Sequence, residues 1–156
     1  MANKKKIANV LANRYASAEL AELWSPEHKI ILERRLWLAV LKAQQARGIE
    51  VPEGTVEKYE AVIDQVDLDS IADRERVTRH DVKARIEEFC ALAGTEHIHK
   101  GMTSRDLTEN VEQLQILQSL RAVRDKAVAV VARTAEKAAQ YQSLVMAGRS
   151  HNVAAQ

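Results

Sequence analysis

Apolar residues recur every three or four positions through residues 103–146, a stretch that contains neither glycine nor proline. This spacing predicts an amphipathic helix. The repeating positions are Leu107, Val111, Leu114, Leu117, Leu120, Val123, Ala127, Val130, Ala138, Tyr141 and Val145. Such a helix would be roughly 60 Å long, whereas a compact chain of this size has a radius of gyration of about 15 Å. We therefore expect it to need partner helices. Any break is expected at residues 120–125, where the apolar stripe thins and charges crowd.

Weaker helical patterns fill the chain before residue 103. Ser25-Pro26-Glu27 marks a helix start, because serine is a favoured N-cap and proline fits the first helical position. Gly48 is the residue expected just past the end of this helix. Further helices are expected at about residues 18–23, 52–63 and 67–75, and one that residues 78–81 open and Gly94 closes, after a loose arm over residues 1–12. No strand pattern is visible, so the predicted fold class is all-α.

Composition narrows the functional classes. The 156 residues fit one domain, or one domain with a protruding helix. The 23 basic and 22 acidic side chains almost cancel, so charge gives no argument for nucleic acid or an anionic membrane as a partner. No apolar run approaches the roughly 20 residues of a membrane span, and no signal-peptide core follows Met1. The many Leu, Ala, Glu, Arg and Lys residues, with few aromatics, five glycines and two prolines, favour an all-helical cytoplasmic protein. The single cysteine, Cys90, excludes an internal disulfide and is expected in the core.

Four polar clusters lie at predicted helix ends, where free backbone amides and side-chain donors converge. They are Arg14-Tyr15, Thr78-Arg79-His80-Asp81, His99 through Ser104, and Arg149-Ser150-His151. The cation of Arg79 and the titratable ring of His80 suit a carboxylate or phosphate ligand. The alternative is a surface arginine beside a solvated histidine. Asp81 is either a ligand contact or simply the cap of its own helix.

The start of the long helix also has two interpretations. Thr103 and Ser104 form either a plain cap, with Asp106 as the acid of a capping box, or an anion site at a helix N-terminus. A metal site is not expected. His28, His97 and His99 have no cysteine or acidic partner at ligand spacing.

Taken together and in order, six motifs resemble the adenylosuccinate lyase family of the fumarase/aspartase superfamily. They are Asn13-Arg14-Tyr15-Ala16-Ser17, Trp24-Ser25-Pro26-Glu27, Glu33-Arg34-Arg35-Leu36-Trp37, Thr78-Arg79-His80-Asp81-Val82, His99-Lys100-Gly101-Met102-Thr103-Ser104 and Gly148-Arg149-Ser150-His151-Asn152. The resemblance runs from about Asn13 to Gln156. Argininosuccinate lyase and fumarase share the Thr-Ser and His turns, but the Arg-Tyr-Ala-Ser and Thr-Arg-His-Asp motifs are typical of the purine branch.

The resemblance implies an N-terminal helical domain, residues 1–102, that leads into the first long helix of a central bundle and the His151 turn, residues 103–156. It implies a homotetramer in which three chains build each active site. It also implies a C–N lyase that eliminates fumarate from adenylosuccinate, giving AMP, and from the succinyl-aminoimidazole carboxamide ribotide of purine synthesis. No cofactor is expected.

Roles follow from the same resemblance. His151 matches the general acid that protonates the leaving nitrogen, and His80 matches a second histidine that binds and orients the substrate. The other matched positions are substrate contacts: Arg14 and Tyr15 for the nucleotide part, Arg79 and Asp81 beside the second histidine, Thr103 and Ser104 for the succinyl end, and Ser150. Relatives often have threonine at Ser150 and proline at Ala154.

The family's base, a serine on a glycine-rich loop, has no match in these residues. We therefore expect a fragment that is inactive by itself. If the long helix is straight, Thr103 and His151 would lie roughly 60–70 Å apart, so they would serve active sites on different subunits. Two alternatives stay open: a non-catalytic helical interaction module, and a sister lyase such as argininosuccinate lyase.

Overall fold

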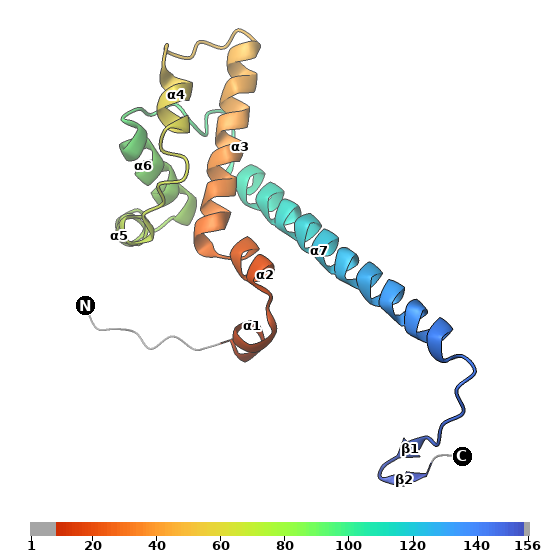
Figure 1. Cartoon of the computed structure of the whole chain (residues 1–156). Coiled ribbons are helices and arrows are strands. Elements are labelled where there is room, and N and C mark those ends of the chain that lie inside the picture. Colours follow the sequence, from red (N-terminus) through yellow and green to blue (C-terminus); the bar gives the residue numbers. More distant parts are fainter. Residues whose placement is uncertain (1–8, 155–156) are drawn as a thin grey trace. The chain divides into compact units, whose positions relative to one another are not determined.

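The computed structural model describes residues 9–154, and for Ser150 and Ala154 it describes the backbone alone (Figure 1). Within this range the backbone forms seven helices and one short hairpin. They are α1 (Val10–Tyr15), α2 (Ala18–Leu23), α3 (Pro26–Ala46), α4 (Thr55–Glu60), α5 (Leu68–Thr78), α6 (Asp81–Ala93), α7 (Ser104–Tyr141), β1 (Arg149–Ser150) and β2 (Val153–Ala154). The predicted all-α fold is confirmed. None of the described helices is long and apolar enough to cross a membrane.

Local signals place most of the helix ends. The Ser25 hydroxyl accepts a hydrogen bond from the His28 amide at 3.1 Å, Pro26 is the first residue of α3, and Gly48 follows with a φ of 81°. The Asp67 carboxylate caps α5 by accepting from the Ser70 amide at 2.9 Å. Each cap satisfies an amide that has no partner inside its helix, so these ends could be predicted from sequence.

Other boundaries differ from the prediction. Residues 10–12 belong to α1, whose first turn is capped by the Asn9 side chain, so the expected loose arm is wrong there; residues 1–8 lie outside the described part. α4 is shorter than predicted, because it begins only after Gly54, in a left-handed conformation, and α5 continues to Thr78.

The long helix runs without a break through residues 120–125 and ends at Tyr141, before the predicted residue 146. That segment holds neither glycine nor proline, and exposed charges do not interrupt the backbone hydrogen bonds of a helix.

The chain divides into two compact units, one ending at Ser119 and the other starting at Leu120. The predicted division at residue 102 stays a prediction. In the first unit α3 packs against α4, α4 packs against α6, and α6 packs against α5 (Figure 1). The core holds Trp37, Leu41, Tyr59, Val82, Phe89 and Leu107, each at most 2% exposed. Cys90 is buried among them, as expected, and burial raises the pKa of its thiol.

A buried ion pair also lies in this core. Arg34 and Glu88 meet at 2.5 Å, and Arg34 donates two further hydrogen bonds of 3.0 Å to the carbonyls of Val62 and Ile63. The second oxygen of Glu88 accepts from the Asp67 amide at 3.2 Å. Because the pair is nearly fully hydrogen-bonded, it ties α3 and α6 to the connection between α4 and α5.

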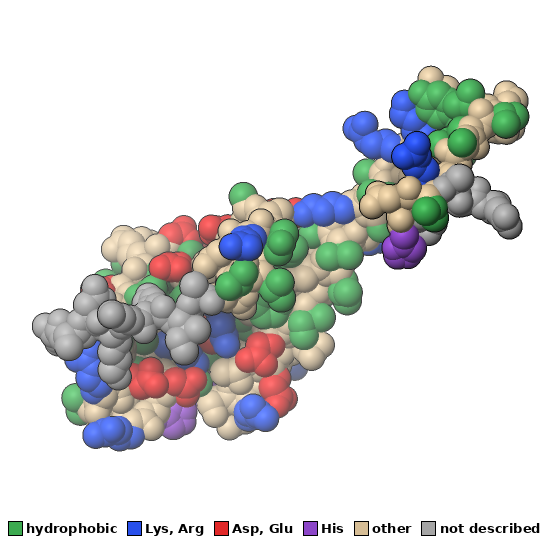
Figure 2. All heavy atoms as spheres, turned by 90° about the horizontal axis from the view of Figure 1, so that it is seen from below, with side chains coloured by type: hydrophobic (Ala, Val, Ile, Leu, Met, Phe, Trp, Pro, Cys, Tyr) green, Lys and Arg blue, Asp and Glu red, His purple; other side chains and the backbone are tan. Residues whose placement is uncertain are grey.

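The second unit contains the rest of α7 and the hairpin. Among its described side chains only Ala122 is buried. Hydrophobic side chains, green in Figure 2, therefore reach the surface; they include Val123, Val128, Val130 and Val131, all more than half exposed. An exposed apolar surface of this kind is typical of a helix that packs against another helix or another protein chain.

Candidate active site

The His80 turn, residues 78–81, joins α5 to α6. Arg79 ends α5 with a φ of 55°, and its amide donates to the Glu75 carbonyl at 2.9 Å. His80 is extended and caps α6, because its Nδ1 accepts from the Lys83 amide at 3.3 Å. A neutral ring whose Nδ1 accepts must carry its proton on Nε2. The half-exposed His80 ring thus presents Nε2–H as a donor.

Asp81 is the first residue of α6 and not its cap, so the simple capping interpretation of this residue is wrong. Its carboxylate instead accepts from Arg85 Nη2 at 2.9 Å, one helical turn later. Burial works to raise the pKa of Asp81, but the Val82 amide, the Arg85 cation and His80 outweigh it, so the pKa lies below its usual value. Asp81 therefore carries its charge beside His80.

The His99 turn leads into α7. His99 has a φ of 65°, and its Nδ1 accepts a hydrogen bond of 2.9 Å from the indole N–H of the buried Trp37. Burial lowers the pKa of His99, the Asp106 carboxylate opposes this, and His80 adds to the lowering. His80 therefore contributes to the electrostatic surroundings of His99.

Asp106 also closes the first turn of α7. Its carboxylate accepts from the Thr103 amide at 2.8 Å, which is the backward half of the predicted capping box. The Thr103 side chain is exposed and that of Ser104 is half-buried. Neither hydroxyl hydrogen-bonds to another residue of the described range, so both remain available at a helix N-terminus.

Arg14 and Tyr15 end the short helix α1. Both side chains are exposed, Tyr15 to 75%, and neither makes a hydrogen bond or ion pair with residues 9–154. The structure does not join them to the His80 turn.

His151 belongs to the second unit, at the tip of the β1–β2 hairpin. The strands pair in antiparallel register, Arg149 with Ala154 and Ser150 with Val153. His151 and Asn152 have φ values of 51° and 66°, as a type I′ turn requires. The His151 side chain is exposed, while the side chain of Ser150 is outside the described part.

Backbone strain coincides with these clusters. Within residues 9–154, the non-glycine residues with positive φ are Arg79, His99, His151 and Asn152. All of them fall inside the motifs named above. Left-handed residues other than glycine are uncommon and are enriched at functional sites. Their positions here support these turns as candidate functional segments.

The sequence interpretation missed His99 and the residues that support Asp81. The sequence places His99 in a polar cluster and at the start of the His-Lys-Gly-Met-Thr-Ser motif, but it assigns the residue no role in the site. Within the described residues no group of three or more histidine, cysteine or acidic side chains could hold a metal ion. Arg85 and its buried partner Glu33 carried no signal except that Glu33 opens the Glu-Arg-Arg-Leu-Trp motif.

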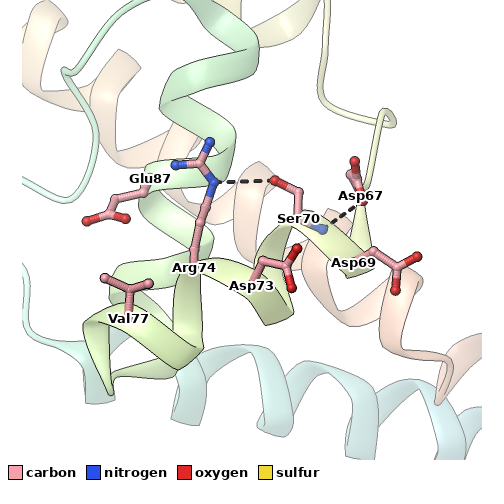
Figure 3. A pocket seen from close by; sticks show the side chains of 7 residues that line it. All are labelled: Asp67, Asp69, Ser70, Asp73, Arg74, Val77 and Glu87. Atoms are coloured by element: carbon pink, nitrogen blue, oxygen red, sulfur yellow. Dashed lines mark hydrogen bonds between the residues drawn. The ribbon is translucent and has the colours of Figure 1, made fainter. Parts of the chain in front are cut away.

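A hollow of about 610 Å³ beside α5 is a separate feature (Figure 3). It is lined by Asp67, Asp69, Ser70, Asp73, Arg74, Val77 and Glu87. The acids near it have local roles, since Asp67 caps α5 and Asp73 pairs with Arg76 at 2.5 Å. It shares no lining residue with the His80 or His99 turns, and its acidic lining would repel a polyanionic ligand.

Comparison with known proteins agrees with the motifs. A family model described as lyase matches residues 16–156. Adenylosuccinate lyase of Schistosoma mansoni is 31% identical over 146 residues, which cover 92% of this chain and 30% of that protein. Adenylosuccinate lyase of Streptococcus mutans is 32% identical over 151 residues, 94% of this chain and 34% of that protein.

A relative with a different name matches over a similar range. N-acetyl-S-(2-succino)cysteine lyase of Enterococcus italicus is 27% identical over 150 residues, 94% of this chain and 33% of that protein. The chain spans about a third of the length of the curated relatives it matches. The family model described as lyase covers nearly the whole chain, which confirms the resemblance carried by the motifs. The chain therefore belongs to the lyase family that this model describes.

Proposed function

We propose that this chain is the N-terminal part of a C–N lyase that releases fumarate from succinylated purine nucleotides. The substrates would be adenylosuccinate, giving AMP, and the succinyl-aminoimidazole carboxamide ribotide. Two features of the structure carry the proposal. His80 presents an outward Nε2–H donor, and Trp37 holds His99 just before a helix N-terminus with two hydroxyls that make no hydrogen bond in the described range. The names of the matched relatives support the same reaction class.

The chemistry explains these residue types. A base removes a proton from the carbon next to a carboxylate, the C–N bond breaks, a carbon–carbon double bond forms, and an acid protonates the leaving nitrogen. The charge that develops on the carboxylate needs preorganised donors. In this proposal His80 and the start of α7 supply donors to the succinyl end, Arg79 supplies a cation, and His151 is the general acid. Arg14, Tyr15, Asp81 and Ser150 remain proposed substrate contacts.

A tetramer and a cytoplasmic location also remain proposals. The exposed valines of the second unit support self-association, because uncovered apolar surface favours burial against another copy. Sedimentation of the 156-residue chain tests this point. A chain that stays monomeric at high concentration would count against it.

A second candidate is a lyase of the same family with a different leaving group. The relative named N-acetyl-S-(2-succino)cysteine lyase favours this alternative. An assay of a complete lyase that contains these residues separates the candidates, with fumarate release followed by ultraviolet absorbance. We expect release from adenylosuccinate and none from succinylcysteine or argininosuccinate. Release from the sulfur substrate alone would replace the proposal, and no release from any of the three would favour the interaction module.

His151 matches the general acid of the family, but no residue of this chain matches its base. This gives a prediction for the chain alone. We expect no fumarate release from adenylosuccinate by the purified 156 residues. Turnover by the chain alone would show that its own residues include a base.

A further inference from the structure

Glu33 is a buried carboxylate that the proposed reaction does not use. It lies on α3 and is fully buried, and its Oε2 is 2.8 Å from Arg85 Nε on α6. The contact is an ion pair without hydrogen-bond alignment, since neither oxygen of Glu33 accepts a hydrogen bond from the described residues. Burying a carboxylate in this way is costly, so its presence needs a physical reason.

The next residue in the sequence gives the contrast. Arg34 is equally buried, but it has a carboxylate and two carbonyls as hydrogen-bond partners. The Arg34–Glu88 pair links α3 to α6, which explains why both side chains are buried. Among the described residues Glu33 forms an ion pair with Arg85 alone, so an effect of its carboxylate on the rest of the protein is expected to act through Arg85.

Arg85 connects the buried carboxylate to the His80 turn. Its side chain is only 13% exposed and contacts Glu33 through Nε and Asp81 through Nη2. Asp81 Oδ1 is in turn 3.6 Å from Nδ1 of His80, too far for a hydrogen bond. Asp81 thus bonds to Arg85 and not to the ring, while Nδ1 accepts from the Lys83 amide.

We propose that Glu33 is a positioning residue: it anchors Arg85, which holds Asp81 away from the ring of His80, so that His80 keeps its proton on the outward Nε2. Without the anchor, the Asp81 carboxylate can approach the ring and accept a hydrogen bond from Nδ1–H, which favours the tautomer whose proton is on Nδ1. The ring would then turn from an Nε2–H donor into an Nδ1–H donor. The inference rests on the proposed function only for the statement that His80 serves the substrate.

The anchor depends on pH. Burial raises the pKa of Glu33 to about 7, against the Arg85 and Lys29 cations and with help from Asp81 and Glu112. These charged groups face Glu33 from α3, α6 and α7. Protonation of Glu33 removes its attraction for Arg85, so acidification through neutral pH should release the anchor just as removal of the carboxylate does.

Nuclear magnetic resonance of the 156-residue chain with labelled histidine and arginine tests the proposal. In the wild type the Arg85 Nε–H signal should titrate with a midpoint near 7, and neutral His80 should be mainly the Nε2–H tautomer. In Glu33→Gln that midpoint should disappear, and the Nδ1–H share of His80 should rise at least about twofold. Glu27→Gln removes an exposed carboxylate from the same helix and should change neither signal. An unchanged His80 tautomer in a folded Glu33→Gln chain would overturn the proposal.

Arg85→Lys keeps the test decisive if Glu33→Gln does not fold. Lysine retains the positive charge but lacks the fork that reaches both carboxylates. It should produce the same shift of the His80 tautomer, and an unchanged tautomer would again overturn the proposal. Because these signals need no turnover, they stand or fall separately from the lyase assay: an inactive complete protein would refute the proposed function and leave the positioning result intact.

Discussion

The His80 turn and the His151 turn both present an exposed histidine beside a residue in a left-handed conformation, yet they are supported in opposite ways. The His80 turn rests on two helix ends, and the carboxylate beside it is held by Arg85 and the buried Glu33. The His151 turn rests on two strands of two residues each, in a unit whose only buried described side chain is Ala122.

In the proposed reaction both histidines act on the substrate, and such groups work when their surroundings hold them before the substrate arrives. The chain itself does this for His80. An isolated two-stranded hairpin is marginally stable in water, so His151 requires further protein around it to reach the same order. Substitutions in only one of the two units test this difference.

The largest effect is expected from Arg34→Ala. Removing one partner of the buried pair leaves Glu88 charged and unpaired, which should cost about 3–5 kcal/mol of unfolding free energy. Urea denaturation measures the loss. Arg35→Ala, an exposed neighbour, should cost almost nothing. The backbone signals of the His151 hairpin should not change in either variant, and a change there would mean that the two turns are coupled.

Glu33→Gln should alter how stability depends on pH. The folded pKa of Glu33, about 7, lies above its unfolded value of 4.5, so the folded state binds the extra proton between these values and the contribution of Glu33 falls as pH rises through this window. The variant should lack this decline, a difference on the order of 2–3 kcal/mol at pH 8.

The measurement must be the wild-type minus variant difference. His99, with its lowered pKa, contributes in the opposite direction, since its unfolded form binds protons more readily and stability rises with pH through about 6.5. Parallel pH curves for the two chains would mean that the pKa of Glu33 is the same in the folded and unfolded states. If Glu27→Gln reproduced the effect, the decline would not come from Glu33.

His80→Ala should cost about 1 kcal/mol, because α6 loses its N-cap. His80→Asn restores a capping side chain and should recover most of this stability without restoring a titratable ring. Thermal or urea unfolding of the two variants measures the cap. In a complete lyase, both should lose activity alike if the ring serves the substrate.

The smallest effect is expected from Asn152→Gly. A type I′ turn accepts glycine readily at a position with positive φ, so the variant should stabilise the hairpin by about 0.5 kcal/mol. Stronger cross-strand signals between the backbones of residues 149 and 154 would show this. No gain would indicate that the turn is already fully formed in the chain.

Local signals explain what could be predicted. The starts of α3 and α5, the end of α6 at Gly94 and the continuity of the apolar stripe in α7 depend on residues within one or two helical turns. The motifs also identified the family. The cap of α6 was harder, because His80 and Asp81 can both cap a helix, and a contact with Arg85 four residues later decided between them.

The sequence by itself therefore determined the helical class, the caps at the starts of α3 and α5, the lyase family and the turns that carry its polar residues. Only the tertiary structure decided that Trp37 holds His99, and that Glu33 and Arg34, adjacent in the chain, have different partners on α6. The physical reason is that capping is a contact between near neighbours along the chain. Burial and ion pairing depend on how helices separated by about 50 residues pack together, and one sequence carries no direct record of those contacts.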